Sequence, residues 1–115
     1  MQEIIYKICP VSLWEEAKLK GSFTGAPVDL ADGFIHFSTA MQVAETAARH
    51  FAGQEGLVLV AVDAKRLGEA LKYEVSRGGA LFPHLYAALD TDAVVWVRQI
   101  ALGTDGNHVL PDLDA

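Results

Sequence analysis

Two short segments of the chain combine histidine, hydroxyl and aromatic side chains within a few positions. The first, GFIHFST, is an apolar run that carries His36 and ends on Ser38 and Thr39. Alternate residues of a strand share a face, so Phe34, His36 and Ser38 would point the same way and could hold polar atoms of a ligand. Thr39 begins a predicted helix, whose first amides could bind an anion. The alternative is a half-buried His36 with one backbone hydrogen bond and hydroxyls that only cap the helix.

The second segment, SRGGALFPHLY, covers residues 76–86. Arg77 and the two glycines after it could place a cation and exposed amides together, as in an anion-binding concavity. His84 and Tyr86 offer hydrogen bonds and a flat surface, which suit ribose and base recognition. Glu74, on the polar face of the preceding strand, is the nearest carboxylate. The alternatives are an ordinary loop with a solvated Arg77, a Tyr86 that pins this loop, and an exposed Glu74.

Other chemistries find little support in the residue spacing. The histidines are dispersed without His-x-x-x-His or Cys-x-x-Cys spacing, and His50 and His108 occupy expected surface and tail positions, so no metal site is predicted. Nothing near Cys9 except Lys7 would activate it as a nucleophile. The chain contains no Gly-x-Ser-x-Gly, dinucleotide-binding or phosphate-loop motif.

The composition limits the class of protein. The 115 residues, 51% of them hydrophobic, are expected to form one domain over residues 1–104 and a loosely held tail over 105–115. The formal net charge of −6, with nine scattered basic residues, argues against nucleic-acid binding. The longest apolar run is too short to cross a bilayer, and the start of the chain lacks the basic region of a signal peptide. A single cysteine fits a reducing cytoplasm.

The first half of the chain is predicted to hold both main helices. A strand over 3–8 is ended by Pro10, and a capping box, SLWE, starts a helix at Ser12 that runs to Lys20 with Gly21 as its stop. Residues 21–33 have loop composition. After the strand GFIHFS, a second capping box, TAMQ, starts a helix that ends at Gly53.

The second half is predicted to be mostly strands. GLVLVAVD is continuously apolar, as in a fully buried strand, and AKRLGEAL makes at most two helical turns. LKYEVS alternates between apolar and polar residues, and RGG forms a turn. LFPHLYAAL is expected to be irregular because Pro83 cannot donate a hydrogen bond, and DAVVWVRQIAL is the last long strand. Helices followed by strands predict an α+β fold.

Four segments together resemble a bacterial family catalogued as Domain of Unknown Function 952. They are IYKI, GFIHFSTAMQVAETAARHF, LVLVAVD and YEVSRGGALFPHLY, and the resemblance extends from about Glu3 to Leu102. It implies the fold of the ADP-ribosyltransferase superfamily, a split two-sheet α+β domain whose members bind NAD in a cleft between the sheets. IYKI would be the first core strand. GFIHFSTAMQVAETA is similar to the second core motif, a strand that ends in hydroxyl residues before a helix.

The resemblance also implies roles for individual residues. Breaking the nicotinamide–ribose bond passes through an oxocarbenium-like transition state, as in glycoside hydrolysis. The implied catalytic residues are His36, Glu74 and His84. The residues implied to bind NAD are Ser38 at the ribose, Thr39, Arg77 at the pyrophosphate, and Tyr86 or Phe37 stacked on the nicotinamide.

The expected ligand is therefore NAD-like or phosphorylated, with NAD as a possible substrate and no metal, bound by a monomer or weak homodimer. The superfamily's catalytic triads do not map cleanly onto this chain, and the glutamate is the member without a clear match. The alternative is a non-catalytic ligand-sensing or protein-interaction module, in which the hydrophobic excess covers a partner or a second copy.

Overall fold

The computed structural model describes residues 3–113, apart from the side chain of Arg77, which lies outside the described part of the chain. Helices and strands are mixed and every strand pair is antiparallel, so the predicted α+β class is confirmed. The largest sheet has the order β1-β4-β8-β9. Its strands are β1 Ile4–Pro10, β4 Leu57–Asp63, β8 Val94–Leu102 and β9 His108–Val109.

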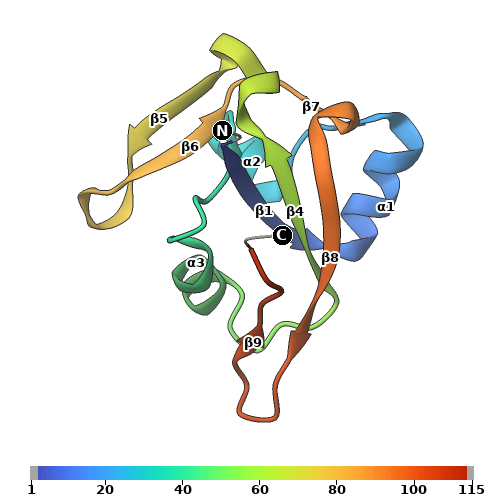
Figure 1. Ribbon diagram of the computed structural model, residues 1–115, viewed down its shortest axis with the longest axis vertical. Coiled ribbons are helices and arrows are strands. Elements are labelled where there is room, and N and C mark those ends of the chain that lie inside the picture. Colours follow the sequence, from blue (N-terminus) through green and yellow to red (C-terminus); the bar gives the residue numbers. More distant parts are fainter. Residues whose placement is uncertain (1–2, 114–115) are drawn as a thin grey trace.

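A second sheet lies beside the first and has the order β3-β6-β5. Its strands are β3 Ile35–His36, β6 Leu81–Leu85 and β5 Leu71–Val75, and a small ladder joins β2 Ser22–Phe23 to β7 Leu89–Asp90. The β5–β6 hairpin extends away from the rest of the molecule, and α1 packs on the opposite side (Figure 1). The helices are α1 Val11–Lys20, α2 Pro27–Asp32 and α3 Val43–His50, with 3₁₀ turns η1 Ala64–Ala70, η2 Arg77–Gly79 and η3 Thr91–Ala93.

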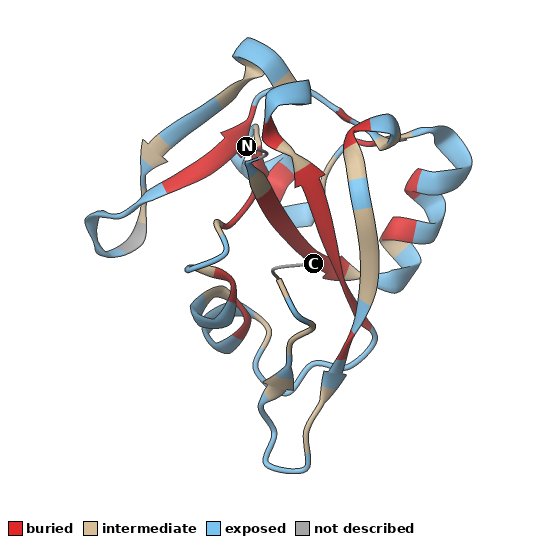
Figure 2. Cartoon of the chain, viewed as in Figure 1, coloured by how far each residue is buried: buried red, intermediate tan, exposed pale blue. Residues whose placement is uncertain are grey.

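The core forms around β4, whose residues are buried from Leu57 to Val62 (Figure 2). This strand lies between β1 and β8, which explains its continuous apolar run: neighbours cover both edges and both faces. One face packs with Trp14 of α1, and the other packs with Val43 and Ala47 of α3. Burial of each large side chain here stabilises the fold by about 1.5–3 kcal/mol.

The starts of both main helices differ from the sequence prediction. Helix α1 begins at Val11 with Pro10 as its N-cap and no side-chain cap, so the box predicted at Ser12 does not form. Its end is as predicted: Gly21 adopts φ 81° and its N–H bonds to Ala17 O. Helix α3 begins only at Val43, because residues 39–42 first make a turn.

The segment predicted as a loop over residues 21–33 is partly regular, which corrects that prediction. It contains β2 and the short helix α2, which starts at Pro27 and ends before Gly33 at φ 87°. The Ala26 N–H donates to Asp29 Oδ2 at 2.8 Å, which satisfies an amide at the helix start. Glycine and proline therefore mark the ends of α2, although their density suggested a loop.

Residues 81–85, expected to be irregular, form the central strand of the second sheet. The Phe37 N–H donates to Pro83 O at 3.0 Å. Because N–H and C=O of one residue point to the same side of a strand, the missing Pro83 N–H also faces β3, which ends at His36. Pro83 therefore joins this side of the sheet through its carbonyl alone.

The last described residues contact the body of the protein. Strand β9 pairs with β8, and the Tyr6 hydroxyl donates to Leu113 O at 3.0 Å. Leu110 and Leu113 pack against the core cluster around Tyr6. These contacts attach residues 108–113 to the first sheet.

Candidate functional site

The two sheets meet at one backbone bridge and then diverge. The Tyr6 N–H donates to Ser38 O and the Ser38 N–H donates to Tyr6 O, both at 2.8 Å. On either side of this bridge, β1 and the chain around β3 have no further ladder contacts. Side chains, rather than backbone hydrogen bonds, therefore line the gap between the sheets.

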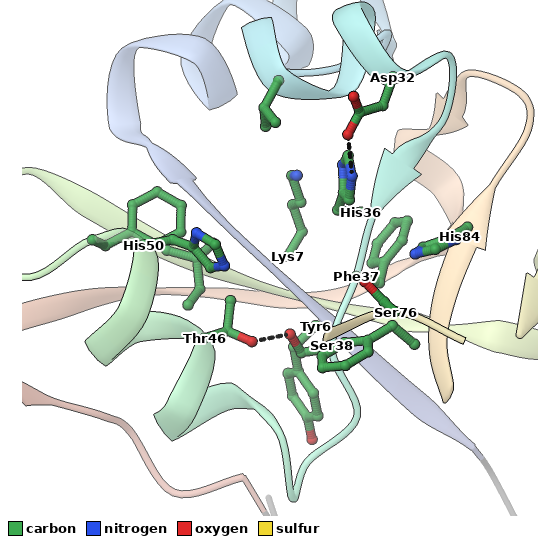
Figure 3. Close-up of a pocket in the computed structure, with 14 residues that line it drawn as sticks. Tyr6, Lys7, Asp32, His36, Phe37, Ser38, Thr46, His50, Ser76 and His84 are labelled. Carbon is green, nitrogen blue, oxygen red and sulfur yellow. Dashed lines mark hydrogen bonds and ion pairs between the residues drawn. The ribbon is translucent and has the colours of Figure 1, made fainter. Parts of the chain in front are cut away.

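A cavity of about 470 Å³ occupies this gap, within the usual range for small-molecule sites (Figure 3). Its polar lining includes Lys7 of β1, His36 and Ser38 around β3, Thr46 of α3 and His84 of β6. Apolar walls come from Tyr6, Ile8, Val28, Phe37, Phe51 and Phe82. A few polar groups on mostly apolar walls are typical of sites that bind organic ligands.

The two predicted segments meet at this cavity. His36 of β3 and His84 of β6 are paired in register, and their ring centroids lie 5.6 Å apart. Phe34 connects the rings: its centroid lies 4.6 Å from that of His36 and is stacked 4.1 Å from that of His84. Two imidazoles far apart in sequence therefore lie on one face of the second sheet.

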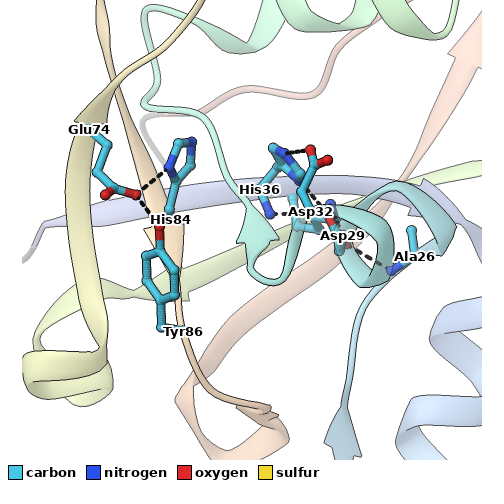
Figure 4. Close-up of polar contacts among 8 residues, drawn as sticks. Ala26, Asp29, Asp32, His36, Glu74, His84 and Tyr86 are labelled. Atoms are coloured by element: carbon cyan, nitrogen blue, oxygen red, sulfur yellow. Dashed lines mark hydrogen bonds and ion pairs between the residues drawn. The ribbon is translucent and has the colours of Figure 1, made fainter.

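Asp29 forms a buried network on the His36 side (Figure 4). Its carboxylate accepts from Lys7 Nζ at 2.9 Å, from the His36 ring at 2.6 Å and from the His36 amide at 3.1 Å. Burial raises the pKa of Asp29, but the hydrogen bonds from His36 and Lys7 outweigh it and lower the pKa to about 2. Asp29 is therefore ionised and joins α2 to β1 and β3.

His36 is held by carboxylates at both ring nitrogens. Nδ1 contacts Asp29 Oδ1 at 2.6 Å and Nε2 contacts Asp32 Oδ2 at 2.9 Å. Carboxylate oxygens only accept hydrogen bonds, so neither ring nitrogen of His36 faces a donor. His36 is arranged to donate protons in hydrogen bonds and has no free nitrogen to accept one.

His84 has a different environment. Its Nδ1 contacts Glu74 Oε1 at 2.8 Å, and the Tyr86 hydroxyl donates to the same oxygen at 2.6 Å. Hydrogen bonds from Tyr86 and His84 lower the pKa of Glu74, and the bond to Glu74 raises the pKa of Tyr86. Glu74 is thus an ionised acceptor and Tyr86 a protonated donor (Figure 4).

Of the other predicted polar site residues, one lines the cavity and the rest are not part of the lining described. Ser38 lines the cavity, where its Oγ lies 2.8 Å from Thr46 Oγ1. Thr39 is not part of the lining. Its N–H donates to the Gln42 side chain at 3.0 Å. Glu74 and Tyr86 also lie outside the lining and contact it through His84. The Arg77 side chain lies outside the described part of the structure.

The sequence reasoning missed the two charged partners in the interior. In the sequence analysis Lys7 appears only as a neighbour of Cys9, and Asp29 belongs to the segment predicted as a loop. A signal for Lys7 was present: a lysine in the middle of the apolar strand IIYKICP needs a buried counter-charge. Burial raises the pKa of Cys9 to about 11, so this thiol is not activated.

Fold and cavity together define an α+β domain of antiparallel sheets, the two larger of which diverge around a cavity of small-molecule size. The chain belongs to the family described as "Protein of unknown function (DUF952)", which matches residues 8–97. The predicted resemblance to this family is therefore confirmed.

Solved structures with a similar sequence have a similar fold. The chain is similar to the crystal structure of protein CC0527 from Caulobacter crescentus, with 52% identity, a TM-score of 0.89, and coverage of 92% of this chain and 93% of that one. The solution structure of CC0527 shows 53% identity, a TM-score of 0.82 and 90% coverage of each chain. No curated protein matches the chain.

The described residues bear on the membrane and metal predictions. None of the helices described is both long and apolar enough to span a bilayer. Within residues 3–113, no group of three or more His, Cys, Asp or Glu side chains is placed to hold a metal ion. His36 and His84 have carboxylate partners instead.

Proposed function

We propose that the cavity binds an NAD-like or phosphorylated small ligand and that the domain is related in fold to the ADP-ribosyltransferases. The observation that carries the proposal is the pairing of His36 with His84 at the wall of a cavity of about 470 Å³. The divergence of two sheets from one bridge is also the arrangement expected of a split two-sheet domain.

The lining suits a ligand with a flat ring and a sugar. Phe37 and Phe82 offer apolar surfaces for a heterocycle, while Ser38 and Thr46 offer hydroxyls to a ribose. Lys7 lines the cavity as well, and its ammonium could approach a phosphate while it remains paired with Asp29. ADP-ribosyl transfer itself is proposed from the family resemblance and the presence of Glu74 beside His84.

A titration of the whole protein with NAD, ADP-ribose and nicotinamide tests the proposal. Backbone amide shifts are expected to cluster on residues 6–8, 34–38 and 82–86, and His36→Ala should abolish them while the domain stays folded. His108→Gln is the matched control, since this ring contacts Gln54 O, away from the cavity. An absence of shifts with all three compounds would contradict the proposal.

A second candidate is self-association through the β5–β6 hairpin. Val75 and Leu81 are paired across this hairpin and are 69% and 53% exposed, and Tyr73 is also exposed. Strands with apolar residues on an exposed face favour association with a second copy of the chain. Sedimentation over a concentration series tests this: Val75→Lys should shift a dimer to monomer, and a monomer at every concentration would contradict it.

A further inference from the structure

Two of the imidazoles that line the cavity, those of His36 and His84, differ in which nitrogens remain available. Both ring nitrogens of His36 face carboxylates. For His84, only Nδ1 has a partner among the residues that the structure describes. A neutral His84 that donates Nδ1–H to ionised Glu74 must carry its lone pair on Nε2.

Nε2 of His84 is accessible. Among the described residues, Trp14 Nε1 is the only buried side-chain nitrogen or oxygen without a hydrogen-bond partner. Because Nε2 of His84 also lacks such a partner, it must have exposed surface. The His84 side chain is only 6% exposed and belongs to the lining of the cavity (Figure 3).

We propose that His84 is the general base of this site and that Glu74 is its positioning residue. Nε2 accepts the proton of a hydroxyl group, either water or an alcohol acceptor, that lies in the cavity. Glu74 holds the ring in the Nδ1–H tautomer, and Tyr86 orients the Glu74 carboxylate. Carboxylate-oriented imidazoles are well suited to this task because the carboxylate stabilises the imidazolium that forms.

The inference rests on the proposed function, which supplies the electrophile. With an NAD-like substrate, the acceptor oxygen forms a bond to the ribose anomeric carbon. The bond from this carbon to the nicotinamide nitrogen breaks, and its electron pair leaves with neutral nicotinamide. The acceptor proton moves to Nε2 of His84, so atoms and charge balance with no further reactant. When the acceptor is water, the products are ADP-ribose and nicotinamide.

His36 takes a different part in the same step. Its ring is fixed between Asp29 and Asp32 and cannot accept a proton while both contacts persist. It therefore contributes to the shape of the cavity wall, and of these two rings the proton transfer is assigned to His84.

The test combines binding, turnover and a spectroscopic measurement on the full chain. Nicotinamide release from NAD should fall by about 10²-fold or more in His84→Gln, as for the loss of a general base. The Kd of ADP-ribose should stay within about threefold of wild type, because the lost interaction acts only in the transition state. Glu74→Gln should lower release by about tenfold or more, while Glu69→Gln, at an exposed glutamate, should leave it unchanged.

The outcomes separate the two proposals. If ADP-ribose binds but His84→Gln releases nicotinamide at the wild-type rate, the general base is overturned and the proposed function stands. If neither NAD nor ADP-ribose binds, the proposed function fails, and the general-base role that rests on it fails as well. Ring-nitrogen shifts of His84 give a readout without ligand: the Nδ1–H tautomer is expected, and a dominant Nε2–H tautomer would overturn the inference. If His84→Gln fails to fold, Glu74→Gln and the tautomer measurement decide.

Discussion

The surroundings of His36 and His84 use the same kinds of side chain for different purposes. At His36, Asp29 is 2% exposed and is shared by Lys7, the His36 ring and two backbone amides. At His84, the Glu74 side chain is 40% exposed and has two hydrogen-bond partners among residues 3–113, His84 and Tyr86. Each site pairs a carboxylate with an imidazole, but the buried member is the carboxylate at the first site and the imidazole at the second.

Burial explains why the two pairs differ in role. A charge removed from water is costly unless partners replace its hydration, so Asp29 and Lys7 depend on each other. The pair joins α2 to β1 and thereby positions Asp32 against His36. Glu74 remains hydrated, so its contribution to stability is small and its influence is on the orientation of His84.

The largest effect is expected from Asp29→Asn. This change keeps the size of the side chain but leaves the buried Lys7 ammonium without a counter-charge. The free energy of unfolding should fall by about 3–5 kcal/mol, the usual cost of breaking a buried ion pair. Denaturant titration measures it.

Asp32→Asn, at a half-exposed carboxylate on the same helix, is the matched control and should cost less than about 1 kcal/mol. Equal losses for the two variants would show that the network around Asp29 has no special structural role.

A smaller effect is expected from acid. Although burial raises it, the pKa of Asp29 in the folded protein is lowered by His36 and Lys7 from its usual value of 3.8 to about 2. A lowered pKa stabilises the fold above the unfolded-state pKa, and this contribution, about 2 kcal/mol, is lost as the pH falls from about 4 to 2. The difference in unfolding free energy between wild type and Asp29→Asn should therefore shrink over this range. A difference that stays constant down to pH 2 would contradict the assignment.

The smallest effect on stability is expected from Glu74→Gln. The same acid-to-amide change as at Asp29 should here leave the free energy of unfolding almost unchanged, because the carboxylate is solvated. Thermal and denaturant unfolding check this value. A loss that approaches that of Asp29→Asn would mean that Glu74 supports the fold rather than the chemistry of His84.

Much of the framework could be predicted because its signals are local. The apolar run of β4, the last long strand β8 and the helix stop at Gly21 each follow from neighbouring residues alone. Helix starts were less predictable: the Thr39 N–H bonds to Gln42 as the capping box suggested, but the helix begins only at Val43. This hydrogen bond can form in a turn as well as at a helix start, so it does not show where the helix begins.

The site was predicted only in part. His36, Ser38 and His84 do line one cavity, whereas the ion pair of Lys7 with Asp29 could not be read from either segment. Asp29 belongs to a stretch rich in glycine and proline, and its burial depends on a strand 22 positions away. The strand around Pro83 could not be predicted for a similar reason, because it forms by pairing with β3, which is distant in the chain.

By itself, the sequence determined which segments are apolar enough to form the sheets and that Gly21 ends the first helix. These properties depend on residues within a turn or a strand of one another. Only the tertiary structure decided that His36 pairs with His84, that Asp29 meets Lys7, and that both histidines line one cavity. Such facts depend on the register between strands distant in the chain, and register is the sum of many packing contacts that no single segment carries.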